Sequence, residues 1–297
     1  MTEMTPYPGR RVALGELSVI RTLPARGRRL VGPWCFLDRF GPLAFRDGKP
    51  MDVGPHPHIG LQTVSWLLEG ELVHDDSLGS HAVLRPGGVN VMTAGRGIAH
   101  TEQTPAAHSG HLDGVQLWVA LPDRVRHDEP SFCHLGTVPV RDAPGGQMQV
   151  FMGTLDGLTS PAPAHSALVG AELALNPGGR VTLALDPSWE HAVVLLGGDA
   201  AVDQVPLETD ALGYLDIGRA GLTVSSQMGG RVLLIGGAPF PEPVLMWWNF
   251  VARTPDEIRQ ARQDWESGTR FGDVAAYPGP RMTAPVLSRL AEPNPAS

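Results

Sequence analysis

Two pairs of polar residues in this sequence have the types and spacing of a metal site. His56 and His58 form a His-x-His pair, and a His-x-Glu pair follows later at His100 and Glu102. In a β-strand, residues i and i+2 point to the same face, so each pair presents two donor groups on one side of its strand. If the two strands lie near each other, three imidazoles and one carboxylate converge. That donor set suits a divalent Fe, Ni, Cu, Zn or Mn ion and leaves positions for water or a substrate.

A His-x-His pair alone is weak support for a metal site, because such pairs in β proteins are more often packed or solvated. The second spaced pair is the observation that favours metal binding. Pro55 and Pro57 flank His56 and restrict the conformations of its strand. The remaining histidines have no comparable support and are predicted to be structural or solvated: His74, His81, His108, His111, His127, His134, His165 and His191.

The elements that must position these residues are short strands. Apolar residues alternate from Val115 to Leu121, which predicts a half-buried strand that ends at Pro122. Further strands are predicted at residues 62–68, 71–75, 81–84, 89–94 and 98–102, and then at 181–185, 191–196, 200–205, 213–217, 222–226 and 231–235. Many short strands separated by frequent turns are typical of a sandwich or barrel.

The composition agrees with a turn-rich, all-β protein of one large or two smaller domains. The 297 residues include 36 Gly and 28 Pro, which are costly inside helices. The hairpin sequences at residues 67–71 and 195–199 resemble each other, as a duplicated domain would. We therefore predict a metal-binding domain at residues 1–135 and a second domain at 136–297. The Pro- and Gly-rich stretch 139–163 is predicted to be mainly a connector, with a strand near 148–152.

One helix is predicted near the end of the sequence. Thr254 can cap it, Pro255 suits its first position, and Glu257 completes a capping box. Gly268 stands where the helix would stop. Its buried face is predicted to consist of Ile258, Ala261 and Trp265.

Charge and cysteine content restrict the functional classes. The formal net charge of −8 disfavours direct nucleic-acid binding, which needs concentrated positive charge. Cys35 and Cys133 lie far apart, as expected for free thiols in a reducing compartment. No apolar run approaches the roughly 20 residues of a membrane span, so we expect a soluble, cytoplasmic protein without membrane partners. The sequence also lacks a phosphate-loop lysine motif and a G-x-S-x-G nucleophile motif.

Two long runs of sequence resemble the pirin family of the cupin superfamily. The first run is HPHIGLQTV at residues 56–64, followed by LEG at 68–70. The second run is MTAGRGIAHTE at residues 92–102. GVQLWVALP at 114–122, EPV at 242–244 and the predicted helix resemble the family as well, so the likeness spans most of the chain. The resemblance implies two cupin-type β-barrels (a bicupin) with a short C-terminal helix and one metal ion in the N-terminal barrel.

Carried over by position, the family's metal ligands fall on His56, His58, His100 and Glu102. General cupins and many pirins have Glu where this chain has Gln62, so Glu102 would be the carboxylate ligand. No histidine follows His191, and the second barrel is expected to be free of metal.

The resemblance implies a quercetin 2,3-dioxygenase, which opens a flavonol ring with dioxygen. Fe(II) is the preferred ion, with Zn, Ni, Cu and Mn as alternatives, and no residue is assigned to an organic cofactor. Glu102 would accept the proton of the substrate hydroxyl. The predicted pocket walls are Gln62, Val64, Trp66, Met92 and Gln116.

Two other functions remain open. Members of the family also act as metal-dependent regulatory or interaction proteins, in which the redox state of the metal alters a surface that contacts a protein partner. A cupin-type sugar isomerase or epimerase is disfavoured, because Lys49 is the only lysine.

Overall fold

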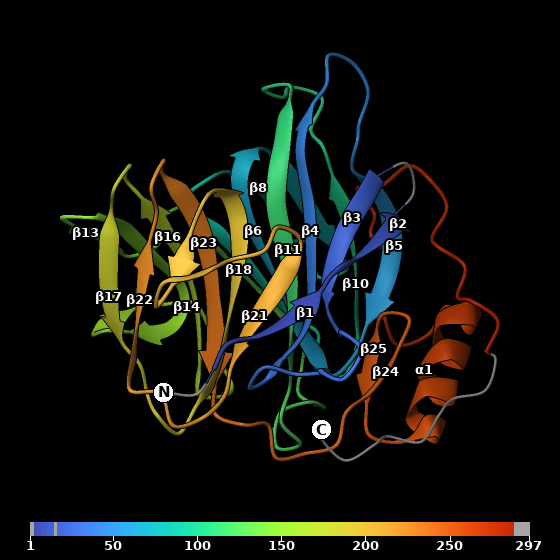
Figure 1. Ribbon diagram of the computed structural model, residues 1–297. Coiled ribbons are helices and arrows are strands. Elements are labelled where there is room, and N and C mark those ends of the chain that lie inside the picture. The colour runs from blue at the N-terminus through green and yellow to red at the C-terminus, as the bar shows by residue number, and fades with distance from the viewer. Residues whose placement is uncertain (1–2, 15–16, 288–297) are drawn as a thin grey trace. The chain divides into compact units, whose positions relative to one another are not determined.

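The computed structural model describes residues 3–14 and 17–287, which form mainly β-strands and one α-helix (Figure 1). The all-β class expected from the sequence is therefore observed. Contacts divide the chain into two compact units. One contains the described parts of Ala13–Val19, Arg39–Gly136 and Pro241–Ser297, and we call it the histidine unit. The other contains the described parts of Met1–Val12, Ile20–Asp38 and Thr137–Phe240. We call it the C-terminal unit because its longest segment is Thr137–Phe240, although the segment Pro241–Ser297 belongs to the histidine unit.

The histidine unit is built on two sheets and a strand pair. The smaller sheet has the order β5 (Asp52–His58), β10 (Ile98–Gln103), β7 (Leu72–Asp76) and β8 (His81–Leu84). The larger sheet has the order β12 (Ser131–Leu135), β9 (Val89–Thr93), β6 (Leu61–Gly70), β11 (His111–Ala120), β4 (Trp34–Ala44), β3 (Leu17–Leu23) and β2 (Arg10–Leu14). The residues of the last three of these strands are divided between the two units. A separate pair consists of β24 (Leu245–Trp247) and β25 (Phe250–Ala252).

The C-terminal unit also contains two sheets. The larger has the order β1 (Thr5–Pro8), β21 (Ala211–Leu215), β18 (Glu190–Gly198), β23 (Gly230–Gly237), β16 (Leu168–Leu175), β14 (Gly146–Leu155) and β13 (Val140–Ala143), with β15 (Leu158–Thr159) paired to β14. The smaller has the order β17 (Arg180–Ala184), β22 (Gly221–Ser225), β19 (Ala201–Val202) and β20 (Val205–Pro206). Buried Val, Leu and Met side chains from both sheets form one core, as the alternation of apolar residues requires.

The helix α1 (Pro255–Ser267) begins and ends at the predicted residues. The Thr254 hydroxyl accepts a hydrogen bond from the Glu257 amide, and Gly268 closes the helix with a φ of 72°. The carboxylate of Glu257 accepts from the Arg253 amide rather than from the cap residue itself. The predicted face of Ile258, Ala261 and Trp265 is buried.

The helix packs on the histidine unit, next to β25 (Figure 1). Its buried face shares a core with Ile59, Ala99 and Phe250, which belong to β25 and to the neighbourhood of β5 and β10. The predicted domain boundaries place this helix with residues 136–297, whereas the contacts group it with the histidines. The boundaries at 1–135 and 136–297 themselves stay a prediction.

Most predicted strands are observed within a few residues, and β8 has the predicted bounds. The segment 200–205 was predicted to be one strand, but the structure has two short strands there, β19 and β20, joined by a tight turn. Asp203 and Gln204 form that turn with φ values of 48° and 75°. The stretch 139–163 is not mainly a connector, because β13 and β14 in it belong to the larger sheet of the C-terminal unit. Within residues 3–14 and 17–287, no helix has the length and apolar character needed to cross a bilayer.

A buried histidine in the C-terminal unit should make stability depend on pH. His191 on β18 is buried, and burial lowers its pKa to about 4 despite opposing contributions from Asp186 and the Trp189 backbone. Below about pH 6.5 the imidazole of His191 is therefore protonated in the unfolded chain, whereas in the folded chain it stays neutral down to about pH 4. The free energy of unfolding should fall in this window by about 1.4 kcal/mol per pH unit, about 3 kcal/mol in total.

Urea unfolding of the wild type and of His191→Leu between pH 7 and pH 4, with a chelator present, measures this effect. The variant should show a smaller slope of unfolding free energy against pH. The other buried histidines are common to both proteins, so they cancel in the comparison. Equal slopes would contradict the prediction.

Candidate metal centre

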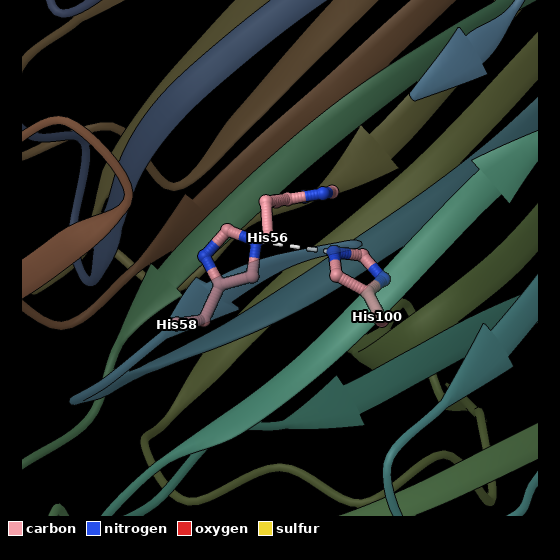
Figure 2. Close-up of side chains that lie close together, drawn as sticks. All are labelled: His56, His58 and His100. Atoms are coloured by element: carbon pink, nitrogen blue, oxygen red, sulfur yellow. Dashed lines mark hydrogen bonds between the residues drawn. The ribbon is translucent and has the colours of Figure 1, made fainter. Parts of the chain in front are cut away.

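Three histidines from two neighbouring strands converge inside the histidine unit (Figure 2). His56 and His58 lie on β5 and His100 lies on β10, where His100 pairs directly with His56 in the antiparallel register. One ring nitrogen of each lies within 4.8 Å of those of the other two. All three side chains are buried, with between 0% and 6% of each residue exposed.

An irregularity in the pairing of β5 with β10 shapes this corner of the site. His100 pairs with His56, but Glu102 pairs with Val53, so Gly54 and Pro55 together face a single residue of β10. Such a bulge turns the strand locally and frees backbone groups from the ladder. Pro55 has no N–H to leave unpaired. The freed carbonyl of Gly54 accepts a hydrogen bond from the His56 ring.

Backbone carbonyls orient two of the three imidazoles. The Nδ1–H of His56 donates to the Gly54 carbonyl at 2.9 Å, and the Nδ1–H of His58 donates to the Asn249 carbonyl at 3.0 Å. A carbonyl only accepts, so these contacts put the ring proton on Nδ1 and leave a lone pair on Nε2. Metal-binding histidines are held in this way in known metal sites.

The ring nitrogens fit a shared cation. The Nε2 atoms of His58 and His100 lie 3.1 Å apart, as the dashed line in Figure 2 marks. Two nitrogens that each bind one ion at about 2.1 Å at a near-right angle lie about 3 Å apart. Burial lowers the pKa of His56 to about 4 and those of His58 and His100 well below the ordinary value, and the neighbouring imidazoles add to the effect. All three rings are therefore neutral near pH 7 and can offer lone pairs to a divalent ion.

Glu102 lies on the same strand as His100, but its carboxylate hydrogen-bonds to residues other than the three histidines in this structure. The Ser65 hydroxyl donates to its Oε1 at 3.3 Å, and the Gln116 side chain also hydrogen-bonds to the carboxylate. Burial raises the pKa of Glu102, and the nearby His74 together with these hydrogen bonds opposes the rise only in part. Within the described residues, Glu102 is not in the group formed by the three histidines. Its assignment as the fourth ligand stays a prediction.

The strand register decides which predicted pocket residues face the histidines. The ring of Trp118 lies 5.3 Å from that of His58, which identifies the inner face of β11. Met92 pairs with Thr63, which pairs with Trp118, and Gln116 hydrogen-bonds to Glu102 on that same face. Met92 and Gln116 therefore lie on the face of the larger sheet that is turned toward the histidines, as predicted.

The other three predicted pocket residues lie on the opposite face of β6. Ser65 reaches Glu102, so its neighbours Val64 and Trp66 point away from the histidines, and Gln62 points away with them. The Gln62 amide donates instead to the Thr93 hydroxyl at 2.9 Å. Placing these three residues on the pocket wall was wrong, because alternation defines two faces without saying which is inside.

His74 lies beside the three histidines, although no sequence pattern singled it out. It is buried on β7, where its Nδ1 lies 3.3 Å from Nδ1 of His100 and its Nε2 lies 3.1 Å from Oδ2 of Asp76. Its ring stacks on Phe132, with centroids 4.1 Å apart. The missed signal is the His-x-Asp spacing of His74 and Asp76, which also puts two polar groups on one strand face. By contrast, the His81 and His111 side chains are exposed.

Comparisons with known proteins agree with this fold. The family described as Pirin matches residues 16–119, and the Pirin C-terminal cupin domain matches residues 170–272. A Pseudomonas aeruginosa protein named "Putative quercetin 2,3-dioxygenase" is 44% identical over 274 residues, which cover 92% of this chain and 87% of that protein. The crystal structure of a quercetin 2,3-dioxygenase from Acinetobacter baumannii is 42% identical, covers 98% of each chain and has a TM-score of 0.94.

More distant structures share only the fold. A bacterial pirin from Escherichia coli, solved in complex with nickel(II), is 16% identical and has a TM-score of 0.64. The match covers 80% of this chain and 99% of that one. Two family domains in succession, together with sequence identity above 40% over nearly the whole length, establish that this chain belongs to the pirin family.

Proposed function

We propose that this protein is a metal-dependent dioxygenase of the quercetin 2,3-dioxygenase type, acting on a flavonol-like aromatic substrate. The observation that carries the proposal is the convergence of three buried, neutral imidazoles, each with one ring nitrogen within 4.8 Å of those of the other two. The names of the relatives in Pseudomonas and Acinetobacter supply the reaction type. Glu102, on the same strand as His100, completes the proposed ligand set.

The proposal includes the architecture that holds this site. Each compact unit would be a cupin-type β-barrel, the metal-binding one built mainly from residues up to 135. The second, built mainly from residue 136 onward, would carry no metal. The absence of histidine after His191 in the sequence supports that asymmetry.

The metal is expected to be one divalent ion per chain, with Fe(II) preferred over Zn, Ni, Cu and Mn. When bound, it would supply Lewis acidity toward the deprotonated hydroxyl oxygen of the substrate and the redox chemistry of dioxygen. His56, His58 and His100 would hold it through Nε2.

The protein side chains have separate parts in this proposal. The Glu102 carboxylate, on the same strand as His100, would accept the proton of a flavonol hydroxyl. Ser65 and Gln116 orient that carboxylate through hydrogen bonds. Trp118 and Met92 supply apolar surface on the inner face of the larger sheet, where an aromatic ring can be excluded from water.

Oxygen uptake with quercetin tests the activity. Protein loaded in turn with Fe(II), Ni(II), Zn(II), Cu(II) and Mn(II) is assayed as the wild type and as Glu102→Gln. We expect uptake by the wild type with at least one ion and a loss of about 10²–10⁴-fold in kcat for Glu102→Gln at equal metal content. Glu69→Gln, the same change at an exposed carboxylate of the histidine unit, should match the wild type.

One observation favours the alternative of a metal-dependent regulatory or interaction protein. The three imidazoles are almost fully buried, an arrangement that suits a sensing ion held away from solvent. Metal-loaded protein that consumes no oxygen with quercetin would overturn the dioxygenase proposal. If its binding to a protein partner then changed with the redox state of the metal, the alternative would replace it.

A further inference from the structure

His100 is held differently from the other two histidines. His56 and His58 donate from Nδ1 to backbone carbonyls, which can only accept. The Nδ1 of His100 lies instead 3.3 Å from the Nδ1 of His74. An imidazole nitrogen donates in one tautomer and accepts in the other, so the backbone leaves the proton position on His100 undecided. The Nε2 of His100 lies 3.1 Å from the Nε2 of His58, which can accept a hydrogen bond, so the state of His74 must favour the Nδ1–H form against that contact.

The state of His74 is in turn set by Asp76. The Oδ1 of Asp76 accepts from the amides of Leu78 at 2.9 Å and Ser80 at 3.0 Å, while its Oδ2 lies 3.1 Å from Nε2 of His74. Burial opposes ionisation of this carboxyl, but the hydrogen bonds from His74 and Ser80 keep its pKa below the ordinary value. A carboxylate only accepts, so the proton of His74 lies on Nε2. In the neutral imidazole of His74, Nδ1 then has the lone pair and accepts from the Nδ1–H of His100.

The surroundings hold the hydrogen-bonded side chains of His100, His74 and Asp76 in place. His74 stacks on Phe132 with ring planes 5° apart, which fixes the direction of both its nitrogens. The side chains of His74 and Asp76 are 4% and 0% exposed, so water does not compete for their hydrogen bonds. His74, Asp76 and His100 lie on one face of the smaller sheet, because β7 and β10 align Asp76 with His100.

We propose that Asp76 and His74 are positioning residues that hold His100 in its Nδ1–H form, so that Nε2 of His100 stays free to bind the metal. The inference rests on the metal site of the proposed function and deepens it. Outer partners of metal-binding histidines typically contribute about 10–100-fold to metal affinity. Here the outer partner of His100 is an imidazole backed by a carboxylate.

The near-isosteric change Asp76→Asn should reverse the chain of hydrogen bonds. Two backbone amides point at Oδ1, so the single amide oxygen of the new side chain must stay there. Its NH₂ group then faces Nε2 of His74 and donates to it. The proton of His74 moves to Nδ1 and donates to His100, whose own proton is displaced to Nε2. That proton occupies the lone pair the metal needs.

Asp75→Asn is the matched control. It removes the same charge one residue away, but the Asp75 carboxylate pairs with His81, whose side chain is 64% exposed. His74→Phe is a second variant, which retains a ring to stack on Phe132 and removes the acceptor for His100. It tests the same link without relying on the orientation of a new amide.

Two measurements on full-length protein test the proposal. Long-range ¹H–¹⁵N correlation spectra of the metal-free protein give the tautomer of His100, and competition with a chromophoric chelator gives the dissociation constant for Co²⁺. We expect Asp76→Asn to shift the proton of His100 to Nε2 and to weaken Co²⁺ binding about 10–100-fold. His74→Phe should weaken Co²⁺ binding to a similar extent, and Asp75→Asn should change neither quantity.

The outcomes separate this proposal from the proposed function. If the wild type binds Co²⁺ and both Asp76→Asn and His74→Phe bind it equally well, the positioning role is overturned while the metal site stands. The positioning role is also overturned if His100 of the metal-free wild type carries its proton on Nε2. A wild type that binds none of the divalent ions overturns the proposed function and this role with it.

Discussion

Replacing His100 with alanine is expected to abolish stoichiometric metal binding. The wild type should retain about one divalent ion per chain after dialysis, and His100→Ala about none. The reason is geometric, because His100 provides one of the three converging ring nitrogens, and its Nε2 lies 3.1 Å from that of His58. The loss in affinity should exceed the roughly 100-fold that removal of an outer partner can cost.

Metal analysis by mass spectrometry and thermal unfolding together check this prediction. An ion that binds only the folded state at 1,000 times its Kd stabilises it by about 4 kcal/mol, so metal should raise the Tm of the wild type but not that of His100→Ala. His111→Ala is the control, since this exposed histidine lies on β11 of the same unit. Equal metal content in His100→Ala and the wild type would contradict the assignment of the site.

The second large effect concerns the C-terminal unit. Trp34→Ala should lower the free energy of unfolding by about 3–5 kcal/mol. Trp34 is fully buried, and its Nε1–H is shared between the carbonyls of Val169 at 3.1 Å and Gly236 at 3.0 Å. Truncation leaves a cavity and removes the donor from both carbonyls. This loss is a large share of a typical domain stability of about 5–15 kcal/mol.

Urea unfolding of Trp34→Ala and Trp34→Phe separates the two contributions. The phenylalanine fills much of the volume but lacks the N–H, so it should cost about 1–3 kcal/mol. A cost for Trp34→Ala no larger than that for Trp34→Phe would contradict the packing argument. Unchanged m-values would show that the variants expose the same surface on unfolding as the wild type, so that the midpoints report stability.

Local sequence patterns were sufficient to predict many of the elements. The helix follows from Thr254, Pro255 and Gly268, because capping and a left-handed end depend only on neighbouring residues. Strands such as β8 and β9 follow from alternation and flanking turns. The strand β16 (Leu168–Leu175) was missed, and its Gly and Ala residues have low strand propensity. Pairing with β14 and β23 on its two sides stabilises it instead.

The candidate site was also predictable from local sequence patterns only in part. The spacing of His56 with His58, and of His100 with Glu102, is a local property that predicts donor groups on one strand face. Whether those faces meet depends on the register of β5 with β10, which aligns His56 with His100. The register of β10 with β7 brings in His74, which no pattern around His100 indicates.

For this protein, the sequence by itself determined the all-β class, the helix, the two spaced donor pairs and the resemblance to the pirin family. Only the tertiary structure decided that the three histidines meet, that His74 and Asp76 stand behind His100, and that Gln62 faces away. The physical reason is that alternation along a strand is a local constraint with a period of two. The pairing of strands, and the choice of the inward face, depend on contacts between residues distant in the chain.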